Sequence, residues 1–304
     1  MEQQASAELL VVVLDARAAL LEDPVAIGAG RAGEAAAGAG SDLPATRLLL
    51  PELWSSLQSF SRAFDLLIPE QRFVLLAANC NRVAVLADCY ADRIDWPVAK
   101  RELGSLLSEP RGLTKPSHIA AAVAKGLCMT MRKQHDHDGL LQARILVMDA
   151  STSATDLLSQ STALVNCAFG AQNKNVLIDC LSMGGCSSVA LQQAASLTKG
   201  RHHVLNAATA EDKVVHSLGQ LILPTLLVHF LPGVAVRQAL VLTQSTNNLS
   251  AVCFCHGKVK ELAFVCSCCL GVFCSNESAI CPSCATRFRP LTDVDPMISD
   301  ELTF

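Results

Sequence analysis

The feature that most constrains this chain is a dense group of cysteines near its carboxyl end. Of the 14 cysteines among 304 residues, eight lie between Cys253 and Cys284, and the other six are scattered. The sequence opens Met-Glu-Gln-Gln, without the basic patch and apolar run of a secretory signal. We therefore expect a reducing compartment, in which crowded cysteines are metal ligands rather than a disulfide framework.

Two Cys-x2-Cys pairs in this group have the spacing of a structural zinc site, Cys266 with Cys269 and Cys281 with Cys284. Two intervening residues allow both thiolates of a pair to bind one ion from a tight turn, and two such turns complete a tetrahedral shell of four sulfurs. A segment this small has little core, so metal binding, ~10–16 kcal/mol in zinc-finger peptides, would supply its folding energy. The sequence predicts a C4 zinc finger with Zn2+ as its cofactor.

The remaining cysteines raise the question of a second metal site. Cys253, Cys255 and Cys274 are three candidate ligands of a site interleaved with the first, an arrangement that would resemble a cross-braced RING. A convincing fourth ligand is missing, because His256 abuts Cys255 and Cys268 is wedged inside a Cys-x2-Cys pair. We favour one zinc ion, with the other cysteines in structural positions.

The chain before the cysteines alternates short apolar runs with helical patterns. The expected strands are continuously apolar, as in strands buried on both faces of a sheet. They cover 9–14, 145–148, 176–178 (ending at Asp179) and 203–205, with a hairpin formed by 73–76 and 83–86; helices are expected over 53–68, 119–131, 156–169, 189–197 and 214–231. This alternation predicts an α/β fold, with a mainly parallel sheet covered by helices on both sides.

Composition divides the sequence into parts. We expect a body over 5–232 with a flexible Ala/Gly-rich insertion at 22–42, a polar linker over 233–250, the cysteine-rich zinc module over 251–290 and an acidic tail over 291–304.

Charge and hydropathy exclude several classes of protein. A net charge of −4 and 4% aromatic residues argue against a protein that coats nucleic acid. The segment 217–236 has no acidic or basic residue, but Pro224, Pro232 and His229 within it suit a buried helix better than a membrane span. We expect no membrane contact.

Carboxylates follow two of the predicted strands. Asp15 and Asp149-Ala-Ser151 stand where an open parallel sheet places its ligands. A magnesium site there would need several oxygen ligands. The pattern that would supply them after the first strand is Asp-x-Ser-x-Ser. Here the letters are Asp15-Ala-Arg17-Ala-Ala19, so both hydroxyls are absent and a positive charge is added. We expect Asp15 to cap a loop or pair with Arg17.

Two further motifs give little evidence of a functional site. Gly28-Ala-Gly30-Arg-Ala-Gly33 matches the dinucleotide fingerprint in letters, but it does not join a strand to a helix. His135-Asp136-His137-Asp138 is typical of a solvated turn. With no phosphate-binding loop or nucleophile elbow, the sequence predicts no catalytic set.

Several short motifs carry a resemblance to a known family. They are Cys253-Phe-Cys255-His256, Phe264-Val-Cys266, Cys269-Leu, Phe273-Cys274, Ile280-Cys281, Cys284-Ala-Thr-Arg-Phe288, Val176-Leu-Ile-Asp179-Cys180, Leu191-Gln-Gln-Ala194, Thr198-Lys-Gly200 and Phe230-Leu-Pro232. From Glu8 to Phe288 the chain resembles the smaller of the two von Willebrand A-type subunits in the core of the general transcription factor TFIIH.

The resemblance implies a von Willebrand A-like Rossmannoid sheet followed by a zinc module. It implies a non-catalytic nuclear scaffold that supports the helicases in transcription initiation and nucleotide excision repair. The expected partners are the larger von Willebrand A-type subunit, whose cysteine-rich region the body would dock, and other core subunits, with no direct nucleic-acid binding. Ala16-Arg17 replaces an Asn-Pro usual in the family, and the tail is acidic rather than basic.

Two alternatives come from other classes of function. A RING-like ubiquitin ligase would need two zinc ions per chain, and a metal-dependent von Willebrand A binding protein would bind Mg2+ at Asp15.

Overall fold

The structure is a computed structural model that describes residues 7–17, 50–67, 72–88, 94–109, 116–137, 141–151, 157–184, 188–205, 219–239, 251–253, 259–260, 262–274, 279–282 and 284–288. The chain divides into two compact units, Met1–Asn248 and Leu249–Phe304. The Ala/Gly-rich stretch at 22–42 and the tail at 291–304 lie outside the described residues, as does most of the predicted linker.

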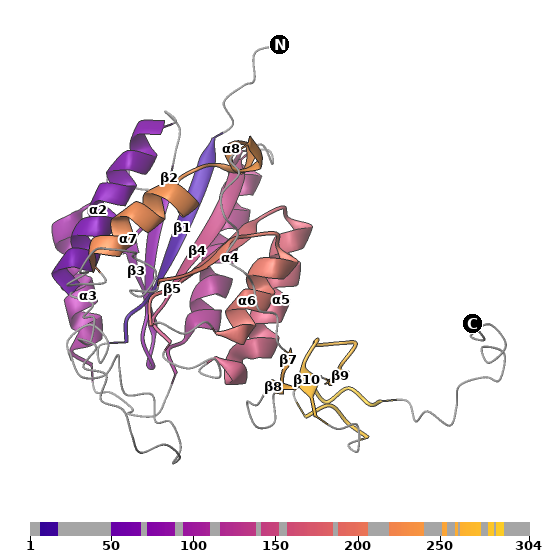
Figure 1. The fold of residues 1–304 in the computed structure, drawn as a ribbon. Helices are drawn as coiled ribbons and strands as arrows, with labels where there is room; N and C mark the ends of the chain where they lie inside the picture. The colour runs from indigo at the N-terminus through magenta and orange to yellow at the C-terminus, as the bar shows by residue number, and fades with distance from the viewer. Residues whose placement is uncertain are drawn as a thin grey trace, which may run out of the picture. The chain divides into compact units, whose positions relative to one another are not determined.

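A six-stranded sheet forms the centre of the first unit, in the order β3-β2-β1-β4-β5-β6 (Figure 1). Neighbouring strands pair in parallel except β2 and β3, which form the expected antiparallel hairpin. The strands are β1 (Glu8–Asp15), β2 (Arg72–Ala78), β3 (Val83–Ala87), β4 (Gln142–Asp149), β5 (Leu177–Ser182) and β6 (His202–Val204). The α/β prediction is confirmed.

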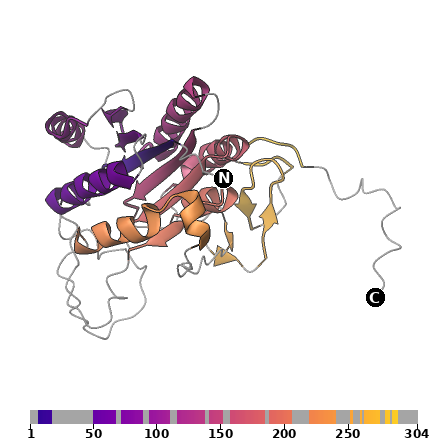
Figure 2. The same cartoon turned by 90° about the horizontal axis from the view of Figure 1, so that it is seen from above.

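Helices cover both faces of this sheet, as the view in Figure 2 shows. They are α2 (Leu50–Leu67), α3 (Trp96–Leu107), α4 (Ile119–Asp136), α5 (Ser161–Asn173), α6 (Val189–Leu197), α7 (Gly219–Thr225) and α8 (Val234–Ala239), with a 3-10 turn at Leu158–Gln160 and a π turn at Leu226–Phe230. Within the described ranges, none of these helices is both long and apolar enough to cross a bilayer.

The two layers follow from the alternation of side chains along β1. Leu10, Val12 and Leu14 join one hydrophobic cluster with side chains of α2, α3 and α7. The residues between them, Leu9, Val11 and Val13, join a second cluster with α4, α5 and α6. Since successive strand residues point to opposite faces, a continuously apolar strand is buried on both sides.

The turn of the β2–β3 hairpin depends on one asparagine. Asn79 Oδ1 accepts hydrogen bonds from the backbone N–H groups of Asn81 and Arg82, both at 2.8 Å. Its Nδ2 donates to the carbonyl oxygen of Leu106 in α3. Asparagine often closes turns in this way, by bonding its own backbone two residues on.

Several predicted boundaries shift. The helix expected over 156–169 is a 3-10 turn followed by α5, which continues to Asn173. Helix α3 was missed, although Asp95 accepts a hydrogen bond from Val98 N and Pro97 stands in the first turn. The described part of the helix expected over 214–231 passes through Pro224 and continues as a π turn, in which Leu231 N donates to Leu226 O.

A fully buried arginine joins β4 to β1 and to the end of the π turn. Arg144 pairs with Glu8 of β1, and its Nη1 donates to the carbonyl oxygens of Phe230 (2.8 Å) and Pro232 (3.1 Å). Burial lowers the pKa of Arg144, whereas the neighbouring Glu8 carboxylate raises it. A buried charge is tolerated only with such partners, so these contacts fix the position of the turn on the sheet.

A second buried ion pair connects α8 to β5 of the sheet. Arg237 donates from Nη1 to Asp179 Oδ1 (2.8 Å) and from Nη2 to Oδ2 (2.6 Å), a bidentate arrangement. One expectation is corrected here: Asp179 was expected to end its strand, but β5 continues to Ser182. Helix α8 lies at the start of the predicted connector, and its Arg237 side chain is buried against Asp179.

The second unit has short antiparallel pairs, β7 (Ala251–Val252) with β8 (Val259–Lys260) and β9 (Phe264–Val265) with β10 (Val272–Phe273). Its buried cluster consists of Cys266, Cys269, Phe273 and Cys281, with Cys284 and Phe288 packed against it. Among the described residues, the core of this unit is therefore made mainly of thiols.

We predict that Arg237→Met lowers the free energy of unfolding of the first unit by about 3–5 kcal/mol, because it leaves the Asp179 carboxylate buried without its bidentate partner. Urea unfolding followed by circular dichroism measures the change. Arg132→Met removes an exposed arginine of α4 and should change stability by less than about 0.5 kcal/mol. Equal effects of the two substitutions would contradict the argument.

Candidate functional site

Four thiols converge in the second unit. The Sγ atoms of Cys266, Cys269, Cys281 and Cys284 all lie within 4.8 Å of one another. The Sγ atoms of Cys266 and Cys284 are 3.7 Å apart, as are those of Cys269 and Cys281. These distances are far from a disulfide bond of about 2.05 Å, and a tetrahedron with Zn–S bonds of about 2.3 Å has edges of ~3.8 Å. The cluster could hold a metal ion.

The two Cys-x2-Cys turns have the same backbone hydrogen bonds. Cys266 N donates to Gly271 O and its carbonyl accepts from Leu270 N. Cys281 N donates to Thr286 O and its carbonyl accepts from Ala285 N, at the same offsets of five and four residues. The residue four after the first cysteine has a positive φ in both turns, 56° at Leu270 and 58° at Ala285. A left-handed backbone conformation is unfavourable for a residue other than glycine. Because both turns adopt it at the same position, we infer that the placement of the thiols determines the backbone conformation of the turns.

The surroundings of the four thiols differ. Hydrogen bonding to Thr286 lowers the pKa of Cys284 to about 6, and the Cys284 Sγ to Thr286 Oγ1 distance is 3.1 Å. Burial raises the pKa of Cys269 to about 12. Because the metal ligand is the thiolate, ion binding must release a proton from Cys269, whereas Thr286 already favours the thiolate of Cys284.

The candidates for a second site are only partly placed. Cys253 is buried and Cys274 is half-buried, and Cys255 lies outside the described residues, as does His256. Among the described residues, the cluster of metal-ligating side chains is the one formed by the four cysteines above. The second site stays a prediction.

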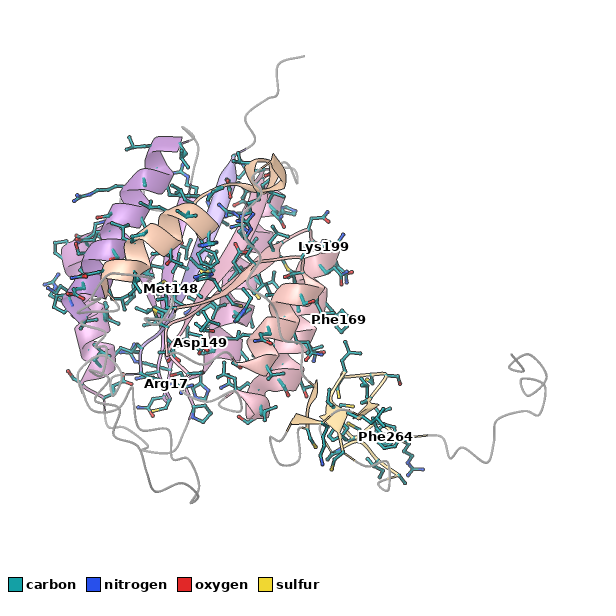
Figure 3. The ribbon with its side chains drawn as sticks, viewed as in Figure 1. Arg17, Met148, Asp149, Phe169, Lys199 and Phe264 are labelled. Atoms are coloured by element: carbon teal, nitrogen blue, oxygen red, sulfur yellow. The ribbon has the colours of Figure 1, made fainter. Side chains whose placement is uncertain are left out.

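A polar cluster lies at the carboxyl ends of β1 and β4, where Figure 3 shows Arg17 and Asp149 at the same end of the sheet. Arg17 Nε is 3.1 Å from Asp15 Oδ2, so the predicted pairing is confirmed. Arg17 Nη2 also donates to Ser151 Oγ at 3.2 Å, which links the segment after β1 to the segment after β4. Asp15 is fully buried and the Arg17 side chain is 19% exposed.

Asp149 is the least satisfied member of this cluster. Its Oδ1 accepts hydrogen bonds from Ser151 N and Oγ, whereas its buried Oδ2 has no hydrogen-bond partner in the part of the chain that the structure describes. Burial and the nearby Asp15 carboxylate raise the pKa of Asp149 to about 7. Two buried carboxyls near one guanidinium thus compete for one positive charge.

Sequence reasoning missed Ser117 as part of this cluster. Its hydroxyl donates to Asp15 Oδ1 across 102 residues of chain. Ser117 follows Pro116, just before α4, and a serine in that position carries no local signal of a distant carboxylate partner. The fold alone brings it there.

The other candidates are not brought together into a site among the described residues. His135 and Asp136 were expected in a turn but belong to the exposed last turn of α4, and His137 follows them. Gly28, Gly30 and Gly33 lie outside the described residues. Ser182 Oγ lies 3.4 Å from His202 Nε2, but Ser182 is fully buried. Burial also lowers the pKa of His202 to about 4, which makes it a weak base.

We predict that Asp149→Asn stabilises the first unit increasingly as the pH rises. A pKa raised on folding favours the folded state fully below the usual pKa of 3.8, and that contribution is lost as the pH rises through about 7. The amide does not ionise, so the gain over the natural chain should grow to as much as about 4 kcal/mol. Urea unfolding at pH 5.5 and pH 8 measures it, with Asp136→Asn as the charge-matched control. An equal gain at both pH values would refute the assignment.

Comparison with known proteins places this architecture in a family. A sequence model of the family "Transcription factor Tfb4" matches residues 92–285. General transcription factor IIH subunit 3 of Dictyostelium discoideum is 29% identical over 187 residues, which cover 62% of this chain and 46% of the relative. General transcription and DNA repair factor IIH subunit tfb4 of Schizosaccharomyces pombe is 30% identical over 193 residues, covering 63% and 58% respectively.

A solved structure supports the same fold. The TFIIH p34 N-terminal domain superposes with a TM-score of 0.50 at 18% identity, covering 71% of this chain and 96% of that domain. The chain spans about half the length of the curated relatives it matches. The family match includes helices α3–α8 and all four clustered cysteines. The chain therefore belongs to the family of transcription factor Tfb4.

Proposed function

We propose that this chain is a non-catalytic structural subunit of the TFIIH core complex. It would support the helicase module through protein–protein contacts in RNA polymerase II transcription initiation and nucleotide excision repair, in the nucleus. The observation that carries the proposal is the family match over 92–285, because it includes parts of both compact units rather than the sheet alone.

The described polar clusters favour a scaffold over an enzyme. At the carboxyl end of the sheet, where α/β proteins place their ligands, Asp15 contacts Arg17 and Ser117, and Oδ1 of Asp149 is bonded to Ser151. The hydroxyl–imidazole contact of Ser182 and His202 is buried. Rigid apolar layers with internally paired charges suit a body that presents surfaces to partners. We propose the larger von Willebrand A-type subunit and other core subunits as those partners, with no direct nucleic-acid contact.

We further propose that Cys266, Cys269, Cys281 and Cys284 bind one Zn2+ ion. Four sulfurs within 4.8 Å of one another suit zinc better than a hard cation such as Mg2+. The proposed organisation is a von Willebrand A-like body over 5–232, a linker over 233–250, the zinc module over 251–290 and an acidic tail over 291–304. Arg237 extends the contacts of the body beyond residue 232.

Zinc stoichiometry separates the scaffold from a RING-like ubiquitin ligase. We predict about one zinc ion per chain by metal analysis, and loss of that ion in Cys281→Ser. Because the module has little core besides its thiols, limited proteolysis should then cut the 251–290 region first, while the sheet unit stays intact.

The matched control for that experiment is Cys268→Ser, which changes an exposed thiol in the other Cys-x2-Cys turn of the cluster. It should keep both the zinc ion and the resistance to proteolysis. Two zinc ions per chain, together with discharge of a ubiquitin thioester by the purified protein, would favour the ligase.

Complex membership is tested in the cells that express the chain. We predict that the tagged full chain co-purifies with the larger von Willebrand A-type subunit and the helicases in near-equal amounts. Recovery of the intact chain without these subunits would contradict the proposed function.

A further inference from the structure

Two thiols of the first unit take no part in the sites described above. Cys128 is an exposed residue of α4, and Cys167 is a half-buried residue of α5. Both are free cysteines. They belong to the first compact unit, whereas the four clustered thiols belong to the second.

The two helices that carry these thiols lie side by side and run in the same direction. At their beginning, Ala120 N of α4 donates to Oε1 of Gln160, the residue before α5, at 2.9 Å. At their end, Gln134 Nε2 of α4 donates to the carbonyl oxygen of Lys174, the residue after α5, at 3.4 Å. Because early residues meet early residues and late residues meet late ones, the helices are parallel.

This arrangement places the two thiols at the same level of the helix pair. Both cysteines lie between the two contacts, and at a rise of 1.5 Å per residue each is about 11 Å along its helix from the first contact. The helices also approach closely at this level, since a Cβ atom on Gly170 of α5 would be 3.4 Å from Leu127 Cδ2 of α4.

The environments of the two thiols differ in a way that suits two different roles. Burial raises the pKa of Cys167, and the negative charge of the neighbouring Cys128 thiolate raises it further. Cys167 is therefore held in the thiol form, whereas Cys128 is open to solvent. Oxidation of cysteine follows exposure and thiolate character, so a dissolved oxidant should react first with Cys128.

We propose that Cys128 and Cys167 are a modification site, at which hydrogen peroxide forms a reversible disulfide between α4 and α5. The Cys128 thiolate attacks a peroxide oxygen and breaks the O–O bond, which gives a sulfenic acid on Cys128 and, after proton uptake, one water molecule. The Cys167 sulfur then attacks the sulfenic sulfur and breaks its S–O bond, and the departing hydroxyl takes the Cys167 proton as a second water. Two thiols and one peroxide thus give one disulfide and two waters.

The disulfide would have two consequences for the first unit. It would keep Cys128 from the sulfinic and sulfonic acids, which a thiol reductant does not reverse, whereas a disulfide is reduced again by thiol exchange. It would also join two helices of one layer covalently and so restrict the unfolded chain. The inference is independent of the proposed function.

The test treats the purified full chain with a small molar excess of hydrogen peroxide, blocks the remaining thiols and digests the protein with trypsin without reductant. The fragments 126–132 and 145–174, which each contain one cysteine, should appear as a linked pair that dithiothreitol separates. The link should raise the midpoint of thermal unfolding of the first unit by about 5–10 °C over the reduced chain.

Three variants control this result, each checked for folding by circular dichroism. Cys167→Ser should stop at the sulfenic acid of Cys128, which dimedone traps. Cys128→Ser should give no linked pair and leave Cys167 reduced. Cys80→Ser removes another half-buried thiol of the same unit and should form the link as the natural chain does.

Three outcomes overturn the proposal. Sulfinic acid on Cys128 of the natural chain, without the linked fragments, would show that Cys167 is out of reach. An unreacted Cys128 at a peroxide dose that oxidises Cys80 would show that Cys128 is not the first target. An equal yield of the linked pair in denaturing urea would show that the packing of α4 against α5 does not bring the thiols together.

Discussion

Burial of the central strand on both faces is the constraint on which the rest of the molecule depends. All eight residues of β1 are buried, including the acidic residues at its two ends. Water cannot solvate those carboxylates, so each needs a cation from the protein itself. Glu8 pairs with Arg144 at the beginning of the strand and Asp15 pairs with Arg17 at its end. The ion pairs therefore follow from the layered architecture.

Local patterns were enough to predict the architecture. Continuous apolar runs indicated strands buried on both sides, two such runs close together indicated the hairpin, and the closeness of Asp15 and Arg17 suggested their pairing. The larger buried network was beyond local reasoning, because Asp179 and Arg237 are 58 residues apart and Ser117 is 102 residues from Asp15. The sequence shows these residues as ordinary polar letters, and only the packed fold decides that they are buried and paired.

The second unit depends on a different kind of stabilisation. Its cysteine spacing predicted two turns that share an ion, and the thiol geometry is compatible with that arrangement. The matching hydrogen bonds and left-handed residues of the two turns were not predicted, because positive φ at Leu270 and Ala285 has no signal in residue types that usually avoid it. A small module can tolerate such backbone strain when strong metal–sulfur bonds offset it.

The bidentate pair between Asp179 and Arg237 also affects how the protein can be divided. An expression fragment that stops at Pro232 would retain the acidic side chain in mid-strand and discard its counter-ion, together with the carbonyl contact of Arg237 Nε to Pro232. Such a fragment would leave Asp179 with only the longer contact to Arg144, at 3.9 Å, and the backbone N–H of Arg201. A fragment that keeps this bidentate pair must therefore include Arg237, and ending it at Ala239 keeps α8 whole.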